Sequence, residues 1–174
     1  FYKKHPKETL IVVTADHETG GMALGTGRYA LNLKALENQK ASAEELSKKI
    51  SDLRKAKNNH VAWEDVKNLL SEQMGFWSVL PISWEQEKKL RDEYEKSFVK
   101  NKVEFAESMY AKTEPMAAKA KEVMDQIAMV GWTSGGHSAG YVPVFAIGAG
   151  SDLFIGKMDN TEIPRRIAKA GGYK

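Results

Sequence analysis

Glycine is distributed so unevenly that it divides the 174 residues of this chain into two kinds of sequence. Of the 14 glycines, only Gly75 lies between Asn32 and Met129, and the others lie in the two flanking segments. Glycine permits the backbone conformations of tight turns, so it marks loops around a sheet. The middle carries 17 Lys and Arg against 17 Asp and Glu, as expected for solvated helices. We predict an α/β core from residues 1–31 and 130–174, with a helical insertion at 32–129.

Capping residues and apolar periodicity predict four helices in the insertion. The first begins at Ser42 with Glu45, and the second runs from Trp63 to Gly75. The third begins at Ser83 with Gln86 and continues through Tyr94, Phe98, Val103, Ala106 and Tyr110, and the fourth begins at Thr113 and Pro115. We expect the apolar stripes to form a core. We also expect Trp63, Phe76, Trp77 and Trp84 to anchor helix packing rather than to bind a ligand.

The flanks predict strands and loops. The β-branched run Leu10–Val13 suits a strand that is buried on both faces of a mostly parallel sheet flanked by helices. Further strands are expected at 130–134 and 142–147, with Pro143 at a strand start or on an edge. The segment 159–164 is a capped helix start that places Ile163 and Ile167 on one face.

The first strand ends in two residues that can bind a metal. Asp16 and His17 follow it directly, and open α/β sheets place their ligand chemistry beyond strand ends. Carboxylate and imidazole are ligands that zinc accepts together, and Gly20 and Gly21 allow a tight turn around an ion. An Asp-His pair also fits an ordinary hydrogen-bonded cap, so the dipeptide alone leaves both interpretations open.

Longer motifs around these residues resemble one family. Residues 14–21, Thr-Ala-Asp-His-Glu-Thr-Gly-Gly, resemble a signature of the alkaline phosphatases. Residues 134–148, Ser-Gly-Gly-His-Ser-Ala-Gly-Tyr-Val-Pro-Val-Phe-Ala-Ile-Gly, resemble a second motif, and Asp-Asn-Thr-Glu-Ile at 159–163 resembles a third. Ser138 replaces a usual Thr, and Tyr141 replaces a frequent acidic residue. Three motifs in the family's order favour membership.

The resemblance implies an alkaline phosphatase-like fold and a centre with two zinc ions about 4 Å apart and a nearby magnesium ion. In this family one zinc activates a serine alkoxide and the other stabilises the leaving-group oxygen of a small phosphate monoester. By position, Asp16 and His17 resemble ligands of the first zinc, and His137 resembles a ligand of the second. The serine, the phosphate-binding arginine and the other metal ligands belong to upstream sequence in the family, so no catalytic residue is assigned here.

These implications lead us to expect the carboxy-terminal part of an alkaline phosphatase. The chain opens on Phe1 without a signal-peptide pattern, and the family is periplasmic or secreted. We expect this fragment to bind zinc weakly and to hydrolyse phosphate esters negligibly. The complete enzyme is expected to be a homodimer, and the fragment is expected to self-associate through exposed sheet edges and apolar faces.

Composition excludes several other classes. The net charge is +3 and the charges are interspersed, so no basic stripe of the kind that binds nucleic acid is present in the sequence. No run approaches the roughly 18 apolar residues of a membrane span. Cysteine is absent, which excludes disulfides and thiolate metal sites and leaves His, Asp and Glu as ligands.

Two alternatives remain open. One is another metalloenzyme of the same superfamily, a phosphodiesterase, sulfatase or phosphomutase, although Thr14 and the Glu-Thr-Gly-Gly run favour the phosphatase branch. The other is a non-catalytic helical interaction module on an α/β base. Glu18 is either a hydrogen-bond partner of a metal ligand or an ordinary polar turn residue. We place His5 and His60 outside the site, in a tail and an interhelical linker.

Overall fold

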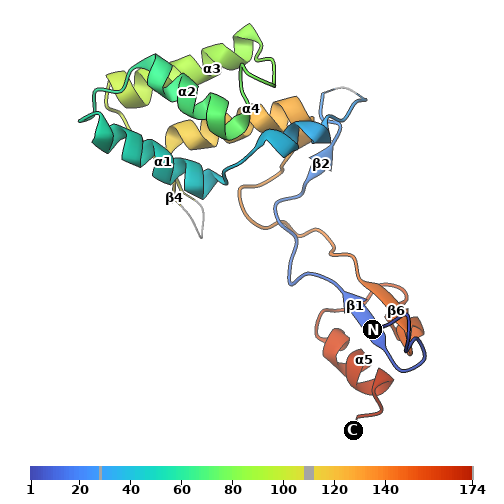
Figure 1. Cartoon of the computed structure of the whole chain (residues 1–174). Helices are drawn as coiled ribbons and strands as arrows, with labels where there is room; N and C mark the ends of the chain where they lie inside the picture. Colours follow the sequence, from blue (N-terminus) through green and yellow to red (C-terminus); the bar gives the residue numbers. More distant parts are fainter. Residues whose placement is uncertain (28, 108–111, 174) are drawn as a thin grey trace. The chain divides into compact units, whose positions relative to one another are not determined.

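The computed structural model describes residues 1–27, 29–107 and 112–173, which separate into two compact units (Figure 1). The first, which we call the helical unit, spans Met22–Gly136. The second, which we call the sheet unit, combines Phe1–Gly21 with His137–Lys174. Within the described residues, we find no helix whose length and apolar character would suffice to cross a membrane.

Four α-helices dominate the helical unit (Figure 1). They are α1 (Ala43–Ala56), α2 (Trp63–Met74), α3 (Trp84–Tyr94) and α4 (Pro115–Ala128), with a π-helical turn η2 (Glu95–Val99) after α3 and a 3-10 turn η1 (Leu33–Asn38) before α1. Two short antiparallel pairs join β2 (Ala23–Leu24) to β5 (Val130–Gly131) and β3 (Ala106–Glu107) to β4 (Lys112–Thr113). The strand predicted at 130–134 is therefore shorter than expected.

The predicted helix ends are mostly correct because they rest on local chemistry. The Ser42 hydroxyl accepts a hydrogen bond from the Glu45 N–H at 3.1 Å, and Ser83 makes the equivalent bond with Gln86 at 3.3 Å. Gly75 ends α2 in the left-handed conformation, with φ at +71°. The fourth helix differs slightly, because Glu114 rather than Thr113 is its N-cap.

The third helix is shorter than predicted. Regular α-helix ends at Tyr94, and η2 continues it only to Val99, so Val103 and Ala106 are not helical. Asn101 adopts a left-handed φ of +53°, which a right-handed helix cannot accommodate. Tyr110, the last residue of the predicted stripe, lies outside the described residues.

The helical unit has a continuous hydrophobic core. Its largest fully buried apolar side chains come from all four helices and the following loops: Phe76, Leu46, Ile50, Leu70, Met74, Leu90, Met116 and Met124. The Trp63 ring meets Trp77 and Tyr94 edge-on, at centroid distances of 6.0 and 5.5 Å. Trp84 does not anchor this packing, since it opens α3 on the solvent side and is 72% exposed.

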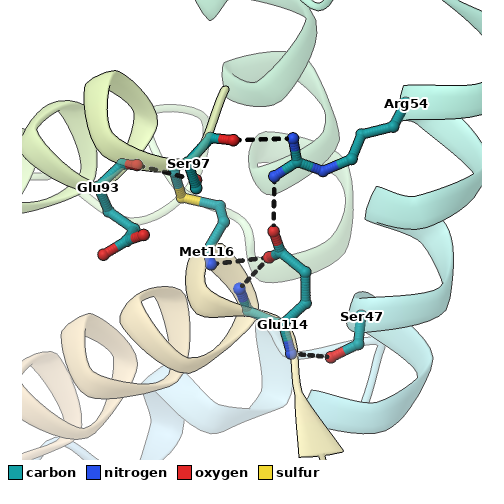
Figure 2. Close-up of polar contacts among 7 residues, drawn as sticks. Ser47, Arg54, Glu93, Ser97, Glu114 and Met116 are labelled. Atoms are coloured by element: carbon teal, nitrogen blue, oxygen red, sulfur yellow. Dashed lines mark hydrogen bonds and ion pairs between the residues drawn. The ribbon is translucent and has the colours of Figure 1, made fainter. Parts of the chain in front are cut away.

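A buried ion pair ties three helical segments of this unit together (Figure 2). Arg54 of α1 donates to the Glu114 carboxylate at 2.8 Å and to the carbonyl oxygen of Ser97 at 3.1 Å. The other Glu114 oxygen accepts from the N–H groups of Met116 and Ala117, at 2.7 and 3.1 Å. Because these N–H groups would otherwise be unpaired at a helix start, Glu114 is both an ion-pair partner and a helix cap.

The sheet unit is built on one antiparallel strand pair. Strand β1 (Leu10–Val13) pairs with β6 (Phe145–Gly148), and the 3-10 turn η3 (Ser151–Phe154) and helix α5 (Glu162–Ala170) follow. Ile11 lies opposite Ile147 and Val13 opposite Phe145. The second strand thus starts later than predicted, and Pro143 precedes it, where its missing N–H costs no ladder hydrogen bond.

Two expectations for β1 are wrong. Its partner β6 is antiparallel rather than parallel, because β6 starts beside the end of β1 and runs back along it. Nor is β1 buried on both faces. Leu10 and Val12 line a cavity with Ile167 and Ala170 of α5, whereas Ile11 and Val13 are 38% and 56% exposed. Helix α5 thus lies against one face of the pair, and the side chains of the other face are partly exposed.

Candidate metal centre

The antiparallel register brings two distant motifs together at one end of the strand pair. Val13, the last residue of β1, lies opposite Phe145, the first residue of β6. Just beyond them, the Thr14 hydroxyl donates to the Pro143 carbonyl oxygen at 3.3 Å. The loop that follows β1 and the loop that precedes β6 therefore meet, although about 120 residues separate them in sequence.

His17 and His137 face each other in these loops. Their ring centroids are 3.7 Å apart, and the ring planes are inclined by 36°. The two histidines that were predicted to bind zinc therefore lie in the same small site, one from each motif. Asp16 joins them, because its Oδ1 accepts a hydrogen bond from the His17 backbone N–H at 3.1 Å.

The His17 ring is oriented by its neighbours. Nδ1 lies 2.8 Å from the Glu18 carbonyl oxygen, and Nε2 lies 3.3 Å from Asp16 Oδ2. A proton on Nδ1 would be donated to the carbonyl, which would leave a lone pair on Nε2. That lone pair faces Asp16 Oδ2, and a cation beside them could bind both atoms. The side chains of His17 and Asp16 are 42% and 85% exposed, so such an ion could reach them from solvent.

Glu18 connects the two loops. One carboxylate oxygen accepts from the Ser138 N–H at 2.8 Å, and the other accepts from the N–H of Gly21. Hydrogen bonding from Ser138, with further backbone bonds from Gly21 and Gly20, lowers the pKa of Glu18 to about 2. The carboxylate therefore stays charged at neutral pH and holds the His137 loop beside the first motif.

The third motif also reaches this site. A shallow pocket of about 230 Å³ is lined by residues 14–18, by Ser138 and Tyr141, and by Asn160 and Ile163. The Asp159 carboxylate accepts from both the hydroxyl and the N–H of Thr161, at 2.7 and 2.9 Å, and these bonds lower the Asp159 pKa. This turn fixes the start of α5 and the position of Asn160.

The donor types suit zinc, but the arrangement of the donors is incomplete. One carboxylate and two imidazoles are ligands that zinc accepts, and a catalytic zinc normally has three protein ligands and an open position. Within residues 1–27, 29–107 and 112–173, no group of three or more His, Cys, Asp or Glu side chains is arranged to hold a metal ion. A zinc ion held by Asp16, His17 or His137 would need further ligands from elsewhere.

The other two histidines contact their own sequence neighbours. His5 stacks on Phe1 with the ring centroids 4.6 Å apart, and its Nδ1 lies 3.4 Å from Glu8. His60 belongs to the helical unit, where its Nδ1 lies 2.9 Å from the Asn58 carbonyl oxygen. Both contacts are local turn interactions.

Comparison with known proteins agrees with the family resemblance of the three motifs. The family model described as alkaline phosphatase matches residues 1–173. The chain belongs to the alkaline phosphatase family. Alkaline phosphatase 3 of Bacillus subtilis (strain 168) is 31% identical over 99% of the chain, and alkaline phosphatase 4 of the same organism is 26% identical over 97%.

A solved alkaline phosphatase has a similar structure. The crystal structure of a cold-active alkaline phosphatase from the psychrophile Shewanella sp. matches 98% of the chain, with a TM-score of 0.63 and 26% sequence identity. This similarity confirms the α/β, alkaline phosphatase-like fold class. The chain spans 32% and 31% of the lengths of the two Bacillus relatives and 35% of the Shewanella chain.

Sequence reasoning underestimated the two connections that hold the loops together. The Glu18 carboxylate accepts a hydrogen bond from the Ser138 backbone N–H, and the Thr14 hydroxyl donates to the Pro143 carbonyl oxygen. A carboxylate followed by Thr-Gly-Gly offers several nearby N–H donors, which was a usable signal for a turn. The partner across 120 residues left no local signal in the sequence.

Proposed function

We propose that this chain supplies part of the zinc site of a phosphomonoesterase. Asp16 and His17 would bind one zinc, and His137 would bind the second. The complete protein would hydrolyse small phosphate monoesters through a phosphoserine, with magnesium nearby. Zinc, when bound, would act as a Lewis acid and lower the pKa of a coordinated hydroxyl. The ligands that are still required would come from sequence other than this chain.

One observation carries the proposal. The rings of His17 and His137 approach to 3.7 Å although the helical unit separates them in sequence. Imidazole and carboxylate side chains that meet in this way are the ligand types that zinc accepts. Family membership supports the same reading, because the matched relatives are named alkaline phosphatases.

The proposal gives each loop residue a role. Asp16 and His17 would present their oxygen and nitrogen to the ion, with the His17 ring held by the Glu18 carbonyl. The Glu18 carboxylate would hold the His137 loop at the right distance through Ser138. The pocket beside Asn160 would admit the phosphate ester. For the complete protein we also propose a homodimer and a periplasmic or secreted location.

A fragment-complementation experiment tests this function. The chain would be co-expressed with the part of Bacillus alkaline phosphatase 3 that lies outside the matched third, and zinc-dependent hydrolysis of an aryl phosphate would be measured. We expect activity in the mixture and negligible activity in the chain alone. His17→Ala and His137→Ala should each reduce the restored activity at least about 100-fold, because each removes a ligand.

The matched control is His60→Ala, which removes a histidine of the helical unit and should leave the restored activity unchanged. Zinc binding by the chain alone, measured by calorimetry, should be weak. A folded complex that stays inactive with zinc would count against the phosphatase and in favour of a non-catalytic module. Full activity of the isolated chain would also contradict the proposal.

A further inference from the structure

A second cavity opens beside the candidate metal centre. Its volume is about 290 Å³, and it is lined by residues 141–144, which precede β6, and by residues 156–158. We propose that Tyr141 and Lys157 in this cavity bind a carboxylate on the organic part of the phosphate ester, and that they thereby select substrates that carry such a group. The inference rests on the proposed function, because it names a class of substrate for that same site.

This cavity adjoins the pocket of the metal centre. Four residues line both of them: Tyr141, Val142, Val144 and Met158. An ester whose phosphate lies beside Asp16 and His17 would therefore extend its organic part past Tyr141 and toward Lys157. The cavity thus lies where a leaving group is expected.

The two polar side chains of this cavity are oriented toward each other. Lys157 Nζ donates a hydrogen bond to the Tyr141 hydroxyl, and it lies 4.5 Å from the centroid of the Tyr141 ring. An ammonium group has three donors, and a hydroxyl that accepts one hydrogen bond still has its own proton to donate. The pair therefore keeps further N–H and O–H donors, which suit the two acceptor oxygens of a carboxylate.

The charge of the cavity favours an anion. Among the described residues that line it, Lys157 is the one charged side chain. The nearest acidic residue along the chain, Asp159, accepts from the hydroxyl and the N–H of Thr161, at 2.7 and 2.9 Å. Tyr141 occupies a position at which the motif frequently has an acidic residue. An acid there would pair with the lysine and repel an anion, whereas a neutral tyrosine leaves the ammonium charge available.

The rest of the lining suits the carbon part of a small ester. Val142, Pro143, Val144 and Met158 provide apolar contacts, and Tyr141 is 77% exposed, so its ring is accessible to a ligand. Sites for small molecules typically combine a mostly apolar lining with a few polar groups that fix the orientation of the ligand. This cavity has that composition.

Binding without turnover tests the subsite. The full chain, with carbon-13 in its tyrosine rings and a chelator present, is titrated with para-hydroxybenzoate and with the uncharged para-hydroxybenzamide. The Tyr141 signal is assigned from Tyr141→Phe. It should reach half of its shift at a concentration of the acid that is about fivefold lower than that of the amide, as one exposed charge pair allows. Lys157→Gln should abolish this preference, and Lys157→Arg should retain it.

The matched control is Lys169→Gln. Lys169 lies in the last turn of α5, in the same unit, and it is exposed and lines neither cavity. This variant loses the same charge as Lys157→Gln, so it should keep the preference of the parent chain for the acid.

Turnover provides the second measurement. In the complex with the complementary part of Bacillus alkaline phosphatase 3, kcat/KM is measured for para-carboxyphenyl phosphate and for para-carbamoylphenyl phosphate. Lys157→Gln should lower the ratio of the two values about fivefold, chiefly through KM, because it removes the charge that attracts the carboxylate. Comparing this ratio between the parent and the variant cancels the different leaving-group chemistry of the two esters.

The two measurements separate this inference from the proposed function. A parent chain without preference for the acid, or a preference that survives Lys157→Gln, would overturn the subsite. A preference that requires Lys157, in a protein whose complex stays inactive with zinc, would support the carboxylate site and contradict the phosphatase. Restored activity with a substrate ratio that Lys157→Gln leaves unchanged would contradict the subsite alone.

Discussion

The helical unit and the sheet unit differ in where their stability comes from. The helical unit encloses a core to which all four of its α-helices contribute, and it buries an ion pair at the start of α4. The sheet unit buries little and leaves one apolar sheet face in water. The candidate ligands Asp16, His17 and His137 all lie in the second. The chain thus joins a helical unit with its own hydrophobic core to a site-bearing unit that buries few apolar side chains.

Hydrogen exchange gives the largest expected contrast between the units. Core amides of α2 and α4 should exchange at least about 1,000-fold more slowly than those of β1 and β6, because local opening costs little where few side chains are buried. Mass spectrometry of the full chain measures both units in one sample. Equal protection of the two would show that the sheet unit has a stabilising partner within this chain.

The buried ion pair provides the next largest effect. Glu114→Ala should lower the free energy of unfolding of the helical unit by about 3–5 kcal/mol, because it leaves Arg54 uncompensated and the helix start uncapped. Urea denaturation followed by circular dichroism measures this. Asp92→Ala is the control, since its ion pair with Lys88 is exposed and should cost less than about 1 kcal/mol. A similar loss in both variants would refute the role of burial.

Matched apolar truncations compare the two units directly. Leu70→Ala removes a fully buried side chain and should cost about 2–5 kcal/mol. Ile147→Ala removes a half-exposed one from the sheet face, and it should change the free energy of unfolding by about 0.5 kcal/mol or less. Denaturant midpoints of both variants test the comparison. A large loss from Ile147→Ala would mean that the sheet face is already covered.

The smallest expected effect concerns Glu93. Burial raises its pKa, opposed by Lys96 and Lys119 and reinforced by Glu114. Its Oε1 is buried and has no hydrogen-bond partner among the described residues. The folded state therefore favours the protonated form, and stability falls as pH rises through the raised pKa. Glu93→Gln should stabilise the helical unit at pH 7.

The same variant has a pH signature. Below a pH of about 4, close to the ordinary pKa of glutamate, Glu93 is protonated in both the folded and the unfolded chain. The advantage of Glu93→Gln should therefore vanish. Thermal unfolding of both proteins at pH 3.5 and pH 7 measures the difference. An advantage of equal size at both pH values would show that the charge of Glu93 is not its cause.

Local sequence signals predicted the helices well. Capping by Ser42 and Ser83, and the stop at Gly75, act within a few residues and are visible in the sequence. The end of the third helix was missed because its apolar spacing continues past Asn101, where the backbone turns left-handed. Trp84 was wrongly expected to anchor helix packing, because apolar periodicity does not show whether the first residue of a helix faces the core or solvent.

Long-range features were harder to predict. An apolar run such as Leu10–Val13 fits a buried parallel strand as well as an exposed antiparallel one, and only the partner decides between them. The motifs identified Asp16, His17 and His137 as candidate ligands because family resemblance carries positional information. That the Glu18 carboxylate joins the two loops depends on the folded path of the chain, which no local pattern encodes.

The separation of Glu18 from Ser138 by 120 residues also has a consequence for synthesis. At about 5–20 residues per second, a ribosome needs roughly 6–24 seconds to make the segment between them. Throughout that interval the apolar strand β1 has been made without β6, its partner in the folded chain. The helical unit can fold during this time. The order in which the two units fold in the cell is therefore set by the insertion rather than by the site.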